Sequence, residues 1–435
     1  MKARSALALA LVIHALFLYS LATGLLDPLF NDTTHRGAPG SDFFVIYKAG
    51  RNVLRGESPY RIDREEPPRS WGDYRYLPLS AFTLSTAVAL LPPEAARRAW
   101  IIGSECLLAA VIAATFALAR DRRSAMVGAS LWLAFSPYYV GLFIGQFDFL
   151  VAAGVFGAAA AMLGLAPAVG AGTWVAATCA KWSGLVMAPL MLRRRRWLPL
   201  VIWSVLSLGT AAVYFSIHPA DFAHFRATLM RGGFATPHAG NHGFQALISS
   251  TATFLVPDLF QDLTRWWDRM GLVLVYANLE RVLLVAALGI AMWATFGGKG
   301  RQTVGEAVAL WTSLLAVAYN EFWEHQYVLL LPGIVLLYLE GRRRAALAAW
   351  WPLALPTIFA LVDRPHEAVV AATPMGYDNP DLFLLLSPLA NLALHLCKPL
   401  AALGLFIAAA APAWTRSGRA GAVTEPLAAE RQGRG

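Results

Sequence analysis

Apolar runs long enough to cross a bilayer recur from one end of this chain to the other, and they constrain its fold more than any other feature. A membrane-spanning helix needs about 20 mostly apolar residues, and the first such run covers residues 6–26. Only 14% of the 435 residues are charged, whereas a soluble domain carries about a quarter. We therefore expect an all-α polytopic membrane protein, with about 10 to 12 transmembrane helices in a membrane domain over 1–414.

The expected later spans follow one another closely. They cover 77–92, 97–119, 124–145, 148–166, 168–192, 197–217, 271–296, 304–320, 327–340, 345–362 and 382–413. Ser136-Pro137 interrupts one of these runs, Lys181 interrupts a second, and Pro399 can break the last. Broken helices at membrane depth are found where they line a cavity. Either of the first two interrupted runs can therefore be a re-entrant pair of half-helices.

The net charge of +9 comes from short basic clusters between apolar runs, which is typical of topology signals and not of nucleic-acid binding. Cytoplasmic loops carry an excess of Lys and Arg, so we expect a multi-pass plasma (inner) membrane protein with both termini cytoplasmic. Four clusters then lie inside: Arg97–Arg98, Arg193–Arg196, Lys299 with Arg301, and Arg342–Arg344. The cluster at 120–123 comes out external as one exception, and residues 415–435 are expected to form a disordered cytoplasmic tail.

Residues 27–75 are too many for a simple connection, and we expect them to form a long first external loop. Apolar residues from Phe43 to Leu54 follow helical spacing there, which indicates an amphipathic interfacial helix lying on the membrane. Ser41 is its expected N-cap and Gly56 its expected stop. A second external loop, 218–243, is rich in His and Arg and is another candidate contributor to a site.

Asp42 falls in the first turn of the interfacial helix, and an ionised carboxylate beside a membrane needs a physical reason to be there. It can act as a general base that takes the proton of an attacking alcohol. It can equally well be a simple helix-capping residue that complements the helix dipole. Spacing alone favours neither interpretation.

Three basic residues also have two interpretations each. Lys181, deep in an apolar run, needs a partner such as a lipid phosphate, unless it snorkels to an interface. His325 can donate a hydrogen bond to a phosphate or a sugar, or it can anchor a span. Arg75, between two tyrosines, can hold a phosphate or contact lipid headgroups.

Several short motifs together resemble glycosyltransferase family 87, whose members are polyprenol-phosphate-mannose-dependent mannosyltransferases and their relatives. The motifs are Asp42-Phe43-Phe44, Tyr47-Lys48-Ala49, Leu54-Arg55-Gly56-Glu57-Ser58-Pro59-Tyr60, Tyr76-Leu77-Pro78, Leu90-Leu91-Pro92, Gly145-Gln146, Ala180-Lys181 and His325-Gln326-Tyr327. The sequence departs from the family pattern at Leu77, where Pro is more usual, and at Asp148, where Asn is more usual. The second departure puts a polar contact at residue 148 in question.

The resemblance implies a GT-C fold, with a site on the non-cytoplasmic face (the periplasm or exterior), and Asp42 as the catalytic base. The expected reaction moves a hexose, mannose being our first choice, from a polyprenyl-phosphate donor to a lipid or glycan acceptor. The candidates for binding the donor phosphate and substrate are Lys181, His325, Arg75, Gln146, Tyr76 and Lys48. No metal is expected, because protein cations can hold the leaving phosphate, and no other cofactor is expected besides the donor as co-substrate.

Two alternatives from other classes stay open on sequence grounds. A lipid or solute transporter also combines many helices with a buried lysine, although its loops are usually short and symmetric. A non-catalytic protein of a cell-envelope complex would leave Asp42, Lys181 and His325 freely replaceable. The acceptor, and the choice between mannose, arabinose and another sugar, are not determined by these residues. Membrane lipids are the other expected partners.

Overall fold

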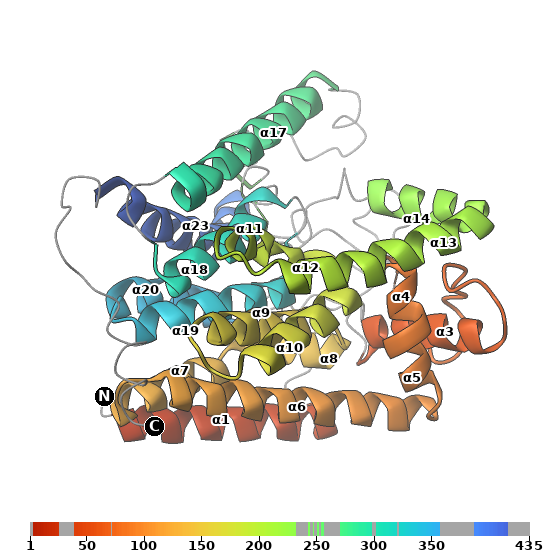
Figure 1. Ribbon diagram of the computed structural model, residues 1–435, viewed down its shortest axis with the longest axis horizontal. Helices are drawn as coiled ribbons and strands as arrows, with labels where there is room; N and C mark the ends of the chain where they lie inside the picture. Colours follow the sequence, from red (N-terminus) through yellow and green to blue (C-terminus); the bar gives the residue numbers. More distant parts are fainter. Residues whose placement is uncertain are drawn as a thin grey trace.

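The computed structural model describes residues 3–25, 39–70, 72–231, 242–243, 247, 250–251, 254–255, 270–297, 302–319, 322–356 and 387–415. Within these residues the chain is a bundle of helices without β-strands (Figure 1). The expectation of an all-α polytopic membrane protein is therefore confirmed. The expected tail beyond residue 415, and most of the loop expected after residue 362, lie outside the described residues.

Five helical segments of the described residues are long and apolar enough to cross a membrane. They are α1 (Ala3–Thr23), α6 (Pro93–Leu118), α7 with α8 (Arg122–Leu133 and Ser136–Ile144), α12 to α13 (Trp197–Trp203, η3 Ser204–Gly209, Thr210–Ile217) and most of α23 (Pro388–Thr415). In α1 and in α12 to α13, only 11% and 17% of the apolar window is buried in protein. Apolar surface left on the outside of a bundle is the surface that lipid covers. Helix α23 continues through Pro399, so the expected break there is absent.

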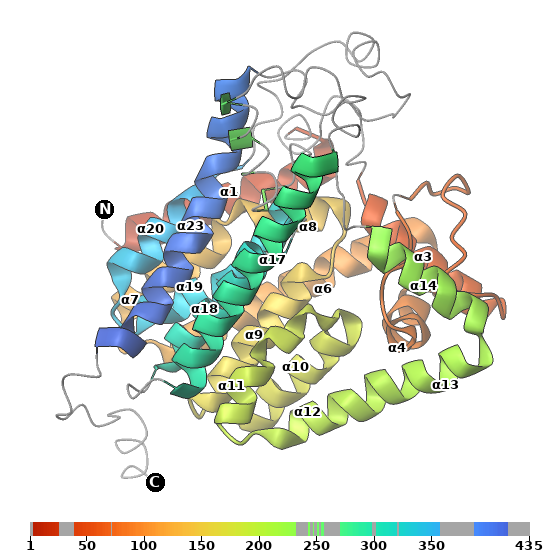
Figure 2. The same ribbon diagram turned by 90° about the horizontal axis from the view of Figure 1, so that it is seen from above.

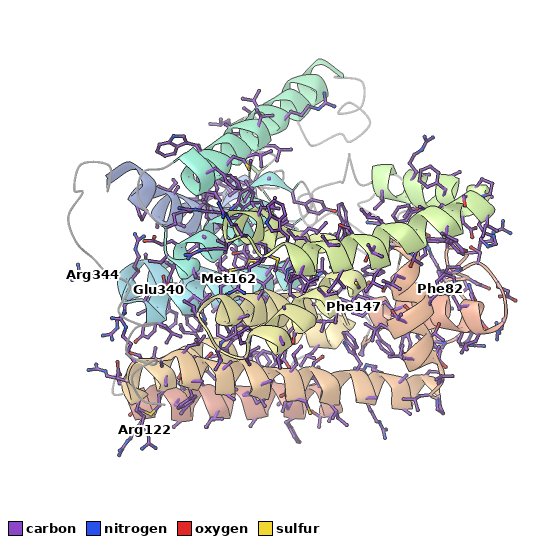
Figure 3. The ribbon with its side chains drawn as sticks, in the orientation of Figure 1. Phe82, Arg122, Phe147, Met162, Glu340 and Arg344 are labelled. Carbon is purple, nitrogen blue, oxygen red and sulfur yellow. The ribbon has the colours of Figure 1, made fainter. Side chains whose placement is uncertain are left out.

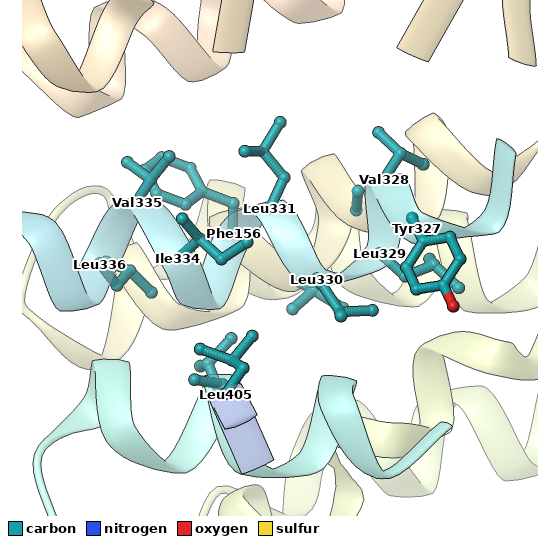
Figure 4. Close-up of a cluster of buried hydrophobic side chains, with 14 of the residues drawn as sticks. Phe156, Tyr327, Val328, Leu329, Leu330, Leu331, Ile334, Val335, Leu336 and Leu405 are labelled. Carbon is teal, nitrogen blue, oxygen red and sulfur yellow. The ribbon is translucent and has the colours of Figure 1, made fainter. Parts of the chain in front are cut away.

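Shorter apolar helices form the centre of the bundle. These are α9 (Asp148–Met162), α18 (Val304–Ala318), and η7 with α19 (Glu324–Leu330 and Leu331–Leu339). Apolar side chains of these helices pack with Leu405 of α23 in one hydrophobic core (Figure 4). Helices α17 (Met270–Met292, followed by η6 Trp293–Gly297) and α20 (Arg343–Ala354) flank this centre (Figure 2).

The run at 77–92 does not cross the bundle, which contradicts its predicted role as a span. It forms α4 (Pro78–Ser80), the π-helical segment η1 (Ala81–Ser85) and α5 (Thr86–Ala89), which stand crosswise to the long helices (Figure 1). These pieces pack against α3 (Ser41–Leu54) so closely that a Cβ on Gly50 would lie 2.0 Å from the Ser85 carbonyl oxygen. The run is too short to span and is used to support α3.

The two interrupted runs behave differently. The first does not turn back: α7 and α8 continue in one direction across the bundle despite Ser136-Pro137. The second is a re-entrant pair, formed by α10 (Pro167–Ala180) and by η2 with α11 (Trp182–Met187 and Ala188–Arg193). Pro167, at its beginning, and Arg195, just after its end, line the same cavity. The chain therefore enters and leaves on one side and turns at Lys181.

The basic clusters test the predicted topology. Arg122 and Arg344 lie at the same end of the bundle, which we call the basic end (Figure 3). The guanidinium of Arg343 donates to Ser124 Oγ at 3.1 Å, which joins the two clusters directly. The predicted placement of the 120–123 and 342–344 clusters on opposite sides of the membrane was therefore wrong. Arg97 was also misplaced, since its side chain lies beside Gly40, before α3, at the opposite end. Both errors follow from counting 77–92 as a crossing.

The predicted amphipathic helix is α3, which ends at Leu54, and Gly56 follows with the left-handed φ of 73° expected of a stop. Its apolar residues from Phe43 to Tyr47 are buried in protein, so the predicted position on the membrane surface is wrong. The N-cap of α3 is Gly40 and not Ser41. The polar face of α3 is covered by protein instead of facing water: Lys48 Nζ donates to the Asp63 carbonyl at 2.7 Å, and Asn52 Nδ2 donates to the Arg61 carbonyl at 2.9 Å. The loop after α3 thus folds back over the helix. Helix α14 (Pro219–Arg231) forms the first part of the predicted second external loop at the same end.

Candidate active site

Asp42 meets Gln146 at the junction of α3 with the turn between α8 and α9. Gly145 makes this junction possible, because it ends α8 with a left-handed φ of 81° and a Cβ there would lie 2.3 Å from the Phe43 Cβ. Glycine alone adopts that conformation readily and tolerates that approach. The Gly40 amide also donates to the Phe143 carbonyl at 2.7 Å. The beginning of α3 is thereby held against the end of α8.

Gln146 links the base candidate to the other polar residues. Its Nε2 donates to Asp42 Oδ2 at 2.6 Å. Its Oε1 accepts from the Tyr76 hydroxyl at 3.2 Å and lies 3.5 Å from Lys181 Nζ. Burial raises the pKa of Tyr76 well above its ordinary value, so this phenol stays protonated and able to donate. An ammonium can only donate and an ionised carboxylate can only accept, so these neighbours fix the orientation of the amide.

Lys181 forms an ion pair with Asp148, at 2.8 Å between Nζ and Oδ1. Lys181 directly follows α10, and Asp148 is the first residue of α9. A cation at a helix C-terminus and an anion at a helix N-terminus both complement the helix dipoles. Within the protein, the partner of Lys181 is therefore Asp148. It is the residue at which the sequence departs from the family pattern.

His325, in η7, completes the network. Its Nε2 lies 3.4 Å from Asp148 Oδ2, and both side chains are buried. No other described residue donates a hydrogen bond to that oxygen. Asp148 Oδ2 is itself buried, so the role of this carboxylate within the network is to hold Lys181 and His325 together.

The environment of Asp42 suits a proton acceptor. The residue is half-buried at the mouth of the network. Burial raises the pKa of its carboxyl from 3.8 to about 6, against the lowering effects of the Gln146 hydrogen bond and the Lys181 charge. A general base is most effective when its pKa lies near the working pH. The carboxylate is thus a stronger base than a free aspartate and is still ionised at neutral pH.

The structure brings together most of the predicted site residues, but not all of them. Asp42, Tyr76, Gln146, Lys181 and His325 belong to one network. Arg75 has an exposed side chain and acts on Asp42 through its charge. Lys48 has a structural role in the first loop, because its ammonium donates hydrogen bonds to the Asp63 carbonyl and, at 3.2 Å, to Ser70 Oγ.

Sequence reasoning missed two contributors. It treated Asp148 only as a doubtful position, although Asp148 is the central acid of the network. It also did not anticipate Lys398 of α23, which forms a buried ion pair with Glu324 at 3.1 Å, immediately before His325. An apolar run with one lysine was a possible signal for Lys398, but its partner is 74 residues away.

The family model of glycosyltransferase family 87 matches residues 74–320, which is more than half of the chain. The chain belongs to glycosyltransferase family 87. The family 87 match includes Tyr76, Gln146, Asp148 and Lys181, whereas Asp42 lies before it and His325 lies after it. No curated protein matches the chain.

Membership of family 87 identifies the protein as a membrane glycosyltransferase. The network contains a carboxylate with a raised pKa, an amide that donates to it, and an ammonium held by an ion pair. Among the described residues, no three His, Cys, Asp or Glu side chains are grouped so that they could hold a metal ion.

Proposed function

We propose that this membrane glycosyltransferase moves a hexose, mannose in the first instance, from a polyprenyl-phosphate donor to a lipid or glycan acceptor. The observation that carries the proposal is the hydrogen bond from Gln146 to Asp42, which joins a proton acceptor to the Lys181–Asp148 ion pair. A transporter would suit the re-entrant helices equally well, but membership of a glycosyltransferase family argues against it.

In the proposed reaction, Asp42 takes the proton of the acceptor hydroxyl as its oxygen attacks the anomeric carbon. The bond between that carbon and the phosphate oxygen breaks, and the polyprenyl phosphate leaves with the electron pair. Lys181 would stabilise the developing negative charge as a cation and His325 as a neutral hydrogen-bond donor, because preorganised donors at such a position lower the barrier. Asp148 would hold the Lys181 ammonium in place through their ion pair.

The charge distribution supports a site on the non-cytoplasmic face. The basic end carries the clusters at 120–123 and 342–344 (Figure 3), and clusters of this kind favour the cytoplasm. Phe147, beside Gln146, lies toward the opposite end from these clusters. With this orientation both termini are cytoplasmic, and a lipid-borne donor reaches Asp42 from the outer leaflet side.

The direct test measures sugar transfer by the Asp42→Asn variant in membranes supplied with polyprenyl-phosphate mannose and, in parallel, with the arabinose donor. Loss of a general base is expected to lower the rate by about 10²- to 10⁴-fold. The matched control is Glu94→Gln, which neutralises an exposed carboxylate in the first turn of α6. Full activity of Asp42→Asn would show that the base is another group. Transfer from nucleotide sugars alone would exclude the proposed donor class.

A further inference from the structure

A cavity of about 360 Å³ lies on the other side of the re-entrant pair, away from the Asp42 network. Its apolar wall comes from α9, α10 and α12, and includes Ala158, Ala171 and Leu198. Met162, another lining residue, lies in the half of the molecule that carries Arg122 and Arg344 (Figure 3). The proposed transfer reaction makes no use of this cavity.

Two arginines give the cavity a strongly positive side. Arg195 and Arg196 both line it. Their side chains are exposed, and no carboxylate of the described residues pairs with either guanidinium. Trp197, 56% exposed, follows directly, and tryptophan is enriched at the level of lipid headgroups. The cavity therefore combines an apolar wall with two available cations at a membrane interface.

The backbone around the cavity is strained. Arg195 has a φ of 55° and Ala166, next to lining residue Pro167, has a φ of 43°. Among the described residues, these are the two non-glycine residues with positive φ. Arg195 occupies the position after α11 where glycine is the usual residue, with its amide bonded to the Leu192 carbonyl and the Arg196 amide bonded to Met191. Strain of this kind clusters at ligand-binding positions, and here it directs an arginine to the cavity.

We propose that this cavity binds one anionic phospholipid. The phosphate lies between the Arg195 and Arg196 guanidinium groups, which match phosphate geometry with paired N–H donors. The first part of an acyl chain lies along the alanines of α9 and α10. Basic pockets between transmembrane helices are suited to such headgroups, and the apolar wall selects a lipid over a free anion. The site does not depend on the sugar, the acceptor or the role of Asp42.

The test uses the purified full-length protein in a neutral detergent, titrated with phosphatidylglycerol or phosphatidylcholine of the same acyl chains. Retained lipid is counted by native mass spectrometry. The Arg195→Ala/Arg196→Ala variant is expected to weaken phosphatidylglycerol binding by about 10- to 30-fold at low salt, from the contribution of two arginines near a headgroup. Ala171→Phe, which fills the cavity without changing charge, is expected to reduce binding as well. Thermal unfolding of each variant checks the fold.

The matched control is Arg122→Ala/Arg123→Ala, which removes the same charge from exposed positions of the same end, outside the cavity. This control is expected to bind phosphatidylglycerol like the unaltered protein. Equal loss in the control would assign the binding to general surface charge and overturn the proposal. Equal retention of both lipids, displacement of lipid by inorganic phosphate, or undiminished binding by Ala171→Phe would overturn it too.

Discussion

Gln146 donates a hydrogen bond of 2.6 Å to Asp42, although 104 positions separate them in the chain. The contact connects α3 to the turn between α8 and α9. Through the other side of the amide, the carboxylate is coupled to Lys181, and through Lys181 to Asp148 and His325. One neutral side chain thus joins a proton acceptor to the Lys181 ammonium.

The raised pKa of Asp42 predicts the pH dependence of sugar transfer. The carboxyl, at a pKa of about 6, can accept a proton only when ionised, so kcat/KM should fall as the pH decreases through about 6. Measurements from about pH 4.5 to about pH 8 on purified enzyme would show this limb. An acid limb near the ordinary aspartate value would mean that Asp42 does not limit the reaction.

The same pKa predicts the stability of Asp42→Asn. Because folding raises this pKa, the ionised carboxylate destabilises the folded protein, and stability is lost as the pH rises through about 6. The asparagine variant should therefore unfold at the same temperature as the parent protein, or a higher one, at neutral pH. A large decrease in melting temperature would show that loss of activity reflects damage to the fold.

Two charge changes should move the acid limb in opposite directions. The negative charge of Asp148 raises the pKa of Asp42, and the positive charge of Arg75 lowers it. Asp148→Asn should shift the midpoint to lower pH, and Arg75→Gln should shift it slightly to higher pH. Arg69→Gln, an exposed arginine of the same loop, should leave it in place. Shifts in the same direction for the first two variants would contradict the electrostatic account.

The sequence predicted α3, its stop at Gly56, and a re-entrant pair at Lys181 as one of two alternatives. Local signals suffice for these features, because helical spacing, a left-handed glycine and a lysine in an apolar run can each be read without knowing the neighbours. The same reasoning mistook 77–92 for a span. Its composition suits a bilayer, and only its packing against α3 shows that it stays at one end.

The sequence predicted most residues of the candidate site but not the contacts between them. Asp42, Gln146, Lys181 and His325 were all named from sequence, whereas Asp148 was set aside. The ion pair that gives Asp148 its role depends on the approach of the end of α10 to the beginning of α9, 33 residues apart. Lys48 was misassigned for the converse reason, since its partners are backbone carbonyls that no side-chain pattern reveals.

Gly145→Ala should separate Asp42 from Gln146. The substitution adds a Cβ 2.3 Å from the Phe43 Cβ and places alanine at a φ of 81°. Gly164→Ala is the control, because its φ is 89° and nothing lies within 4 Å of the added atom. The control should cost about 1 kcal/mol from backbone strain alone. Gly145→Ala should destabilise more and lose most of its transfer activity. Equal melting temperatures and equal activities of the two variants would show that this close approach has no functional importance.

The buried Lys398–Glu324 ion pair is expected to stabilise the beginning of η7, which carries His325. Lys398 Nζ lies 3.1 Å from Glu324 Oε1 and also donates to the Leu355 carbonyl at 2.6 Å. Lys398→Met would leave the carboxylate without its cation in an apolar environment, which should cost about 3 to 5 kcal/mol of unfolding free energy. Arg69→Met breaks an ion pair whose partners are 82% and 81% exposed, and such pairs contribute about 0 to 1 kcal/mol. Chemical unfolding of both variants in detergent measures the difference. Adding Glu324→Gln to Lys398→Met should restore part of the stability, because the unpaired charge is removed. If the double variant were no more stable than Lys398→Met, the cost would come from lost packing and not from the buried carboxylate.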